Sequence, residues 1–230
     1  MRPYLTEYFA CGKEAAEWLF GKKLASKAVI LPNAIDTKRY QFSERIRKEM
    51  REQLGISPQT MVICHVGSFV KAKNHQFIIS IFKHLHDQVS NALLLLIGDG
   101  ELRASIEQQV QVLSLENHVR FLGIRSDVNK WLMAADVFLF PSIHEGLPMS
   151  LVEAQCSGLP CVVSDVVPQE ACMTDLITRL PINNKEAKWA ETIIHSFPIS
   201  YDRSSYVQQI AGAGYDIRQN VKVLQNLYLR

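Results

Sequence analysis

The feature that most constrains the fold is an alternation of short apolar runs with amphipathic stretches. The apolar runs, rich in aliphatic and β-branched residues, are Met61–Val66, Leu93–Ile97, Val119–Leu122, Val137–Phe140 and Cys161–Val163. Strands that are so continuously apolar are buried on both faces, as in a parallel sheet. The repeated strand–helix alternation therefore predicts an α/β fold with a doubly wound parallel sheet.

Residues with helical spacing and helix-start signals predict the connecting helices. Asn74 is expected to cap the first helix, and residues 102–113 carry the second. Ser126 is expected to cap the third, and the fourth opens near Pro148 and ends before Gly158. The ligand edge of such a sheet is formed by the carboxyl ends of its strands, so functional residues are expected in the loops that follow the strands.

Two flanks fall outside this predicted core, which runs from about residue 56 to residue 180. Residues 7–21 are predicted to form a helix that ends at Gly21, and Lys27–Leu31 a strand. Residues 185–230 have the pattern of two or three helices.

Composition excludes several classes of protein. A chain of 230 residues with 47% hydrophobic residues and a net charge of +2 is not disordered. Its longest purely apolar run, Ala92–Ile97, is far shorter than the roughly 18 residues of a membrane span, and its amino terminus has no apolar signal core. Residues 44–52 mix basic with acidic side chains, which predicts a solvated helix face and no nucleic-acid partner. The five cysteines form no C-x-x-C pair, which predicts buried, reduced thiols in a cytoplasmic protein: Cys11, Cys64, Cys156, Cys161 and Cys172.

Two carboxylates flank the predicted start of the fourth helix. The free backbone N–H groups and the dipole of a helix start favour an anion. Because Pro148 has no N–H, the available donors are Gly146, Leu147, Met149 and Ser150. Glu145 and Glu153 would repel a bare phosphate, but ionised carboxylates accept hydrogen bonds from hydroxyls. The pattern favours a phosphate joined to sugars at both ends. The alternative is a loop charge and a partly exposed helix residue, because Glu44 and Glu52 have the same spacing in a charged helix.

A second group of residues follows the first core strand, in the segment Gly67-Ser68-Phe69-Val70-Lys71-Ala72-Lys73-Asn74. Small residues there let the backbone approach a ligand. Lys73 lies beside a predicted helix start, where its charge would neutralise a phosphate. Lys71 is interpreted as a surface lysine, and the same interpretation stays open for Lys73.

Other motifs are weak or absent. Gly98-Asp99-Gly100 begins a dinucleotide-binding pattern, but Arg103 stands at the third glycine position, and the sequence contains no G-x-x-x-x-G-K-[ST]. It also contains no Asp-x-Asp, so no metal site is predicted. His84 and His86 would point to different helix faces. His144 is the histidine nearest to the predicted site.

Several segments occur in an order that is more specific than any segment alone. They are Pro32-Asn33-Ala34-Ile35-Asp36, Val66-Gly67 with Lys73-Asn74, Leu96-Ile97-Gly98-Asp99-Gly100, Phe121-Leu122-Gly123, and Phe140-Pro141-Ser142 leading into Glu145-Gly146-Leu147-Pro148 with Glu153-Ala154. In these segments the chain resembles the carboxyl-terminal, donor-binding half of glycosyltransferase family 4, retaining enzymes of the GT-B fold, and most resembles the bacterial exopolysaccharide and capsule group. The resemblance runs from about residue 8 to residue 195 and implies a Rossmann-like sheet.

The resemblance also implies roles for the site residues. Glu153 would hold the ribose hydroxyls of the nucleotide, and Glu145 those of the transferred sugar. Lys73 and the loop amides would hold the diphosphate, while the segment Gly123–Arg125 would lie near the base. Lys73 and Glu145 are the implied catalytic residues, because departure of the nucleoside diphosphate builds negative charge. The implied donor-binding set is Gly67, Ser68, Lys73, Gly123, Arg125, Glu145, Gly146, Leu147, Met149, Ser150 and Glu153. No cofactor or metal is expected; the nucleotide-sugar is a substrate.

The chain departs from the family pattern in three respects. Ser68 stands where the family usually has an arginine, and Ala34 where it usually has a glycine. The resemblance also implies an amino-terminal acceptor domain, of which this chain is expected to carry only the end, so that missing half is an expected partner. The expected division is residues 1–31 as the remnant of that domain, 32–56 as a linker and lead-in helix, 57–184 as the nucleotide-sugar-binding domain and 185–230 as carboxyl-terminal helices. The apolar residues of the remnant are expected to form a patch for self-association: Phe9, Trp18, Leu19 and Phe20.

The leading hypothesis is transfer of a sugar, with retention, from a nucleotide-sugar to a glycan or lipid-linked acceptor in polysaccharide biosynthesis. The expected donor is a UDP-sugar, and the isolated chain is expected to be inactive or weak. The expected location is the cytoplasm, at the inner face of the membrane for a lipid-linked acceptor. Two alternatives stay open: a non-catalytic nucleotide-sugar-binding or partner subunit, and a nucleotide-sugar epimerase with catalytic carboxylates on both halves.

Overall fold

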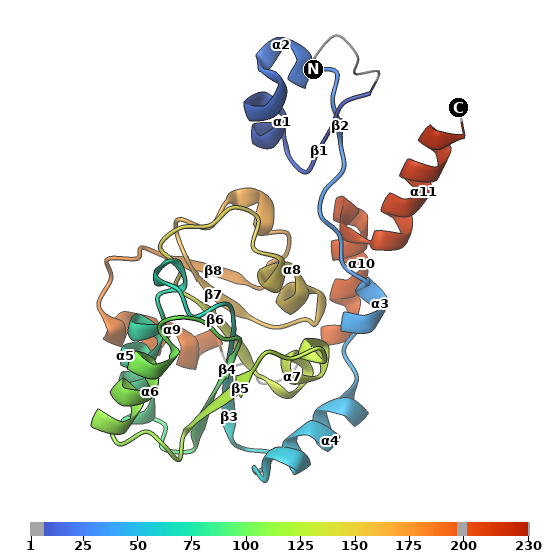
Figure 1. Ribbon diagram of the computed structural model, residues 1–230. Helices are drawn as coiled ribbons and strands as arrows, with labels where there is room; N and C mark the ends of the chain where they lie inside the picture. The colour runs from blue at the N-terminus through green and yellow to red at the C-terminus, as the bar shows by residue number, and fades with distance from the viewer. Residues whose placement is uncertain (1–6, 197–201, 230) are drawn as a thin grey trace.

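The computed structural model describes residues 7–196 and 202–229, and its centre is a six-stranded parallel sheet. The strand order is β5-β4-β3-β6-β7-β8, and every neighbouring pair is parallel (Figure 1). The strands are β3 (Met61–Val66), β4 (Ala92–Ile97), β5 (Val119–Gly123), β6 (Val137–Phe140), β7 (Cys161–Ser164) and β8 (Ile177–Leu180). This order confirms the doubly wound sheet predicted from the apolar runs.

The strand order reverses between β3 and β6. The chain runs outward from β3 through β4 to β5 and then returns to pair β6 with the other edge of β3, through Ile63 with Val137 and Cys64 with Phe138. The loops that leave β3 and β6 therefore turn in opposite directions. In open α/β sheets the crevice between two such loops is where ligands bind.

Helices cover both faces of the sheet because alternate strand residues point to opposite sides. One buried cluster joins Ile63 to α5 (His75–His86), α6 (Arg103–Val112) and α9 (Glu186–Ser196). The other joins Val62 to helices that include α4 (Glu44–Leu54), α7 (Val128–Ala134), α8 (Met149–Cys156) and α10 (Tyr206–Ile210).

Helix α4 is attached to the sheet by a buried ion-pair network, so the predicted solvated face is wrong in part. Asp136, at the start of β6, accepts hydrogen bonds from Arg47, from Arg51 and from the backbone N–H of Val62. Arg51 is 6% exposed, and burial lowers the pKa of its guanidinium. Arg45 and Lys48 do lie on an exposed face.

The amino-terminal flank forms a small unit set apart from the main sheet in Figure 1. It consists of β1 (Phe9–Ala10), α1 (Lys13–Phe20), α2 (Lys22–Ala25) and β2 (Val29–Ile30), with β1 and β2 paired in parallel. The predicted helix over residues 7–21 therefore starts too early, because Phe9 and Ala10 pair with β2; its end at Gly21 is confirmed. Trp18 is 85% and Leu19 47% exposed, while Phe9 and Phe20 are half-buried. Self-association through this patch stays a prediction.

Other differences follow from tertiary context. Strand β8 was not predicted because an edge strand with two exposed residues, Thr178 and Arg179, lacks a continuous apolar run. Helix α7 is preceded by Asp127 rather than capped by Ser126. The carboxyl-terminal flank is more interrupted than predicted: it adds η4 (Arg203–Ser205) and η5 (Ala211–Tyr215) before α11 (Ile217–Tyr228).

The five cysteines differ in their exposure to solvent. Cys64, Cys156 and Cys161 are buried, Cys172 is half-buried, and Cys11 is exposed, which contradicts the prediction for Cys11; all of them are free. Among residues 7–196 and 202–229, no helix is both long and apolar enough to traverse a bilayer.

Candidate functional site

Lys73 and Glu145 meet in the crevice between the loops that follow β3 and β6. The Lys73 Nζ atom, at the end of the short helix η2 (Lys71–Lys73), lies 2.6 Å from Glu145 Oε1. The side chains are 21% and 7% exposed, and Lys73 Nζ also lies 4.9 Å from the ring centroid of Phe140. The structure thus brings together the two residues for which the family resemblance implies catalytic roles.

The backbone beside Glu145 offers free hydrogen-bond donors. Helix α8 begins at Met149 after Pro148. Within the described residues no acceptor is bonded to the backbone N–H groups of Gly146, Leu147, Met149 or Ser150. These donors lie at or just before the positive end of the α8 dipole, so this loop favours an anion.

The loop after β3 packs tightly on the loop after β4, which explains the glycines of the weak dinucleotide pattern. A Cβ atom on Gly98, whose φ is +135°, would lie 2.1 Å from the carbonyl oxygen of Gly67. A Cβ atom on Gly100 would lie 2.8 Å from the backbone nitrogen of Phe69. Gly98 and Gly100 therefore permit loop packing, and Ser68 is left exposed between the two contacts.

Glu153 lies on α8 and contacts a residue that the sequence reasoning missed. The Tyr40 hydroxyl, from α3 (Thr37–Tyr40), interacts with the Glu153 carboxylate. Burial raises the pKa of Glu153, although the interaction with Tyr40 and the charge of Arg39 act in the opposite direction. Burial and the Glu153 charge both raise the pKa of Tyr40. No sequence motif marks Tyr40, because its partner lies more than 100 residues away in the chain.

Among the described residues, Gly123 and Arg125 form no hydrogen bond with Lys73 or Glu145. Gly123 ends β5, and its carbonyl accepts a hydrogen bond from the Gly98 N–H at 2.9 Å. Arg125 forms a bidentate pair with Asp127, with both distances 2.9 Å, and lies 5.4 Å from the Trp131 ring. Their predicted place near the base stays a prediction.

A buried histidine pair, also missed from the sequence, lies beneath the Lys73 loop. His65 Nδ1 lies 2.9 Å from the Leu139 carbonyl oxygen, and the His75 ring stacks on Phe69 at 4.0 Å. Burial lowers the pKa of both imidazoles, that of His75 to about 4, and the Lys73 charge acts in the same direction. The two histidines are therefore neutral at pH 7. By contrast, His144 and Lys71 are exposed.

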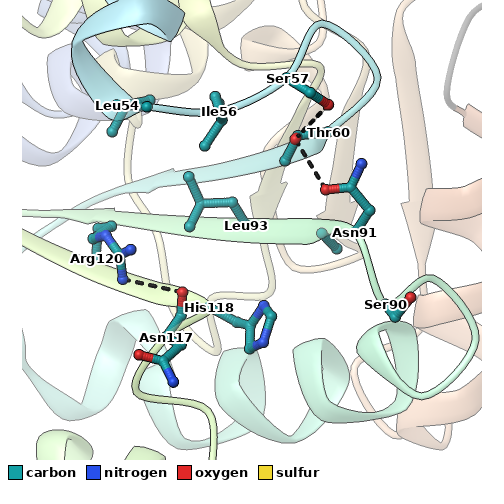
Figure 2. A pocket seen from close by; sticks show the side chains of 12 residues that line it. Leu54, Ile56, Ser57, Thr60, Ser90, Asn91, Leu93, Asn117, His118 and Arg120 are labelled. Atoms are coloured by element: carbon teal, nitrogen blue, oxygen red, sulfur yellow. Dashed lines mark hydrogen bonds between the residues drawn. The ribbon is translucent and has the colours of Figure 1, made fainter.

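The hollow shown in Figure 2 lies at the opposite ends of the strands. It has a volume of about 270 Å³ and is lined by residues such as Thr60, Asn91 and Arg120, which lie near the amino ends of β3, β4 and β5. Thr60 donates to Asn91 Oδ1 at 3.0 Å, and Arg120 donates to backbone carbonyls of its own loop. Ligands of such sheets bind at the carboxyl ends, so we place the candidate site at Lys73 and Glu145. In the described ranges, no group of three or more His, Cys, Asp or Glu residues could hold a metal ion.

Comparison with known proteins decides the family. The sequence model of a family described as Glycosyl transferases group 1 matches residues 46–198. The chain belongs to this family. This member of the family is 35% identical over 227 residues to the putative glycosyltransferase EpsF of Bacillus subtilis, covering 97% of this chain and 59% of that protein. It is 32% identical over 145 residues to the UDP-Gal:alpha-D-GlcNAc-diphosphoundecaprenol alpha-1,3-galactosyltransferase of Escherichia coli, covering 61% of this chain and 37% of that one.

Solved structures of similar fold agree with this family. The chain matches Anabaena HepE in complex with UDP with a TM-score of 0.80 and 20% identity, over 99% of this chain and 65% of that one. It matches WaaG, a glycosyltransferase involved in lipopolysaccharide biosynthesis, with a TM-score of 0.70 and 23% identity, over 85% of this chain and 55% of that one. These likenesses confirm the Rossmann-like sheet of the GT-B fold. The chain spans about 59% of the length of the EpsF protein.

Proposed function

We propose that this chain is the donor-binding half of a retaining glycosyltransferase. It takes a sugar from a UDP-sugar and passes it to a glycan or lipid-linked acceptor in polysaccharide biosynthesis. The observation that carries the proposal is the Lys73–Glu145 pair at the reversal of the sheet, where Glu145 directly precedes the segment with the free N–H groups of Gly146, Leu147, Met149 and Ser150. The names of the EpsF protein and the Escherichia coli galactosyltransferase support the activity and the donor class.

In this proposal the diphosphate of the donor lies between Lys73 and the α8 amino end. The ammonium of Lys73 and the loop N–H groups hold its oxygens, with Gly67 and Ser68 allowing the backbone to approach. The ammonium supplies a positive charge and the N–H groups supply hydrogen bonds and the helix dipole, and the proposal includes no metal ion. Glu145 accepts hydrogen bonds from the transferred sugar. Its Oε1 atom, 2.6 Å from Lys73 Nζ, also keeps the Lys73 side chain in the crevice.

The chemistry follows from where charge develops. When the bond between the sugar C1 and the diphosphate oxygen breaks, negative charge grows on that oxygen. Lys73 and the α8 dipole are already oriented toward it, so they stabilise the transition state more than the ground state. At the other end of the donor, Glu153, oriented by Tyr40, accepts hydrogen bonds from the ribose hydroxyls. The segment from Gly123 to Arg125 lies near the base.

Thermal unfolding with nucleotides tests donor binding. UDP at about a hundred times its dissociation constant should add about 2.7 kcal/mol of stability, which raises the Tm by roughly 5–10 °C. GDP and ADP should give smaller shifts. Glu153→Ala should abolish the UDP shift, whereas Glu116→Ala, at an exposed position in another loop, should keep it. Equal shifts in both variants, or no UDP shift in the wild type, would overturn the site.

Turnover separates this proposal from the two alternatives. The chain should be assayed together with the part of the EpsF protein that it does not match, with a UDP-sugar and a lipid-linked acceptor. Release of UDP that depends on the acceptor supports transfer. Interconversion of the UDP-sugar without an acceptor would support an epimerase, and binding without turnover would support a non-catalytic subunit. With an acceptor on a lipid carrier, the proposed reaction takes place at the cytoplasmic face of the membrane.

A further inference from the structure

Asn74 has a backbone conformation that few residues adopt. Its φ is 58° and its ψ 43°, between η2 and α5, and Ser114 is the other non-glycine residue with positive φ in the described part of the chain. Asparagine tolerates this left-handed region better than most residues. This conformation turns the chain sharply between η2 and α5, directly after Lys73. The conformation of Asn74 therefore helps to fix the position of the Lys73 backbone, from which the Lys73 side chain extends.

The Asn74 side chain does not cap α5, which corrects the prediction from sequence. Its Nδ2 atom instead donates to the carbonyl oxygen of Pro141 at 3.1 Å, across the crevice. Beside it, the backbone N–H of Ile143 donates to the carbonyl oxygen of Ala72 at 2.9 Å. These two hydrogen bonds, which we call the loop clasp, join the two loops that carry Lys73 and Glu145.

The clasp lies where the sheet no longer holds the two loops together. The ladder between β3 and β6 joins Ile63 with Val137 and Cys64 with Phe138, and it stops there. Beyond it, the described hydrogen bonds between the two segments are the contact of His65 with the Leu139 carbonyl, the two clasp bonds and the Lys73–Glu145 pair itself. The two clasp bonds are therefore the links that join the two loops without involving the Lys73 and Glu145 side chains themselves.

We propose that Asn74 is a positioning residue that holds Lys73 against Glu145 and so sets the geometry in which the donor diphosphate is bound. The last part of this inference rests on the proposed function. Asn74 combines tolerance of positive φ with a side-chain donor. Glycine supplies the conformation without the donor, and aspartate supplies it with a carboxylate that cannot donate to Pro141.

The first test measures the Lys73–Glu145 pair without any nucleotide. Lysines of the intact chain are labelled briefly with acetic anhydride, and the labelling rate of each is followed by mass spectrometry. Asn74→Gly should raise the rate at Lys73 by about 2- to 10-fold, the range expected for one lost hydrogen bond. Exposed Lys71 is the internal control and should not change. An unchanged rate at Lys73 would overturn the positioning role.

Ser114→Gly is the matched control variant. It removes the same backbone strain at the other left-handed residue, at φ 56°, far from the crevice loops in sequence. Asn74→Gly should unfold at a slightly lower temperature than Ser114→Gly because it also loses the hydrogen bond to Pro141, but only Asn74→Gly should change Lys73 labelling. If Ser114→Gly changed it as much, the effect would be general loosening and the inference would fail.

The second test follows UDP binding by calorimetry and includes a double-mutant cycle. Asn74→Gly should weaken UDP binding by about 2- to 10-fold in the wild-type background and leave it unchanged in a Lys73→Met background, because Asn74 acts through Lys73. Equal weakening in both backgrounds would overturn the inference. If the wild type bound no UDP, the proposed function would fail, and labelling would still decide whether Asn74 positions Lys73.

Discussion

Lys73 and Glu145 form an ion pair at 2.6 Å across the one place where the strand order of the sheet reverses. Each comes from a different loop, yet the pair is mostly shielded from water, with Glu145 only 7% exposed. A cation held this way keeps its place before a ligand arrives. Such preorganisation is what an enzyme needs where negative charge develops.

Removing the ammonium should weaken nucleotide binding strongly. Lys73→Met keeps part of the aliphatic stem and loses a charged hydrogen bond to the diphosphate, so UDP affinity should fall by about 10- to 100-fold. Lys71→Met, two residues away and exposed, should change the affinity little. Because Lys73→Met leaves Glu145 without its partner, the double variant with Glu145→Gln checks that the loss is not one of folding. Similar UDP affinities for Lys71→Met and Lys73→Met would contradict this role.

An arginine at position 68 should improve donor binding. Ser68 is exposed beside Gly67, where the resembled family usually has an arginine. Ser68→Arg adds a planar bidentate donor within reach of the diphosphate, and we expect UDP to bind about 3- to 10-fold more tightly. Ser90→Arg adds the same charge near the hollow of Figure 2 and serves as the control for long-range attraction. A gain of equal size in both variants would show that only net charge matters.

The buried ion-pair network of Arg47, Arg51 and Asp136 should contribute strongly to the stability of the fold. Asp136→Ala leaves Arg51 buried and Arg47 partly buried without their carboxylate, and we expect the free energy of unfolding to fall by about 3–5 kcal/mol. Asp87→Ala removes the partner of Lys83 in an exposed pair and should cost less than about 1 kcal/mol. Urea unfolding measures both variants. A small loss in Asp136→Ala would mean that α4 is held by its apolar contacts alone.

Acid should destabilise the chain through His75. The pKa of His75 is lowered from 6.5 to about 4 in the folded chain. The unfolded chain therefore binds the proton more strongly, and the stability contributed by neutral His75 is present above pH 6.5 and lost as the pH falls to about 4. We expect a loss of about 3 kcal/mol from this group. His75→Phe, which keeps an aromatic ring against Phe69, should flatten the pH dependence of urea unfolding. Exposed His84→Gln should not, and an unflattened curve for His75→Phe would contradict the assignment.

Local signals in the sequence were sufficient to predict the core strands and the site loops. The runs Met61–Val66 and Val137–Phe140 appear in the structure with the predicted bounds, because a strand buried on both faces is apolar throughout. The helix start after Pro148 and the glycine after the end of α8 were also predicted from their neighbours, and Gly158 has a positive φ of 63°.

Contacts between distant segments could not be predicted. The sequence predicts Arg51 to lie on a solvated helix face, because nothing near it in the sequence shows that it forms an ion pair with Asp136. Asn74 has the residue type of a helix cap, but its side chain reaches Pro141 instead. Tyr40 carries no motif, although it contacts Glu153. In each case the packing of other helices and strands brings a polar side chain next to a partner that is distant in the sequence.

The most direct test of the account is a titration of the isotopically labelled chain with UDP, followed through its backbone amide NMR signals. We expect the largest shifts at Gly146, Leu147, Met149 and Ser150, whose N–H groups are free in the described structure, and none at the hollow lined by Thr60 and Asn91. Shifts centred on that hollow, or no shifts at the start of α8, would contradict the central claim.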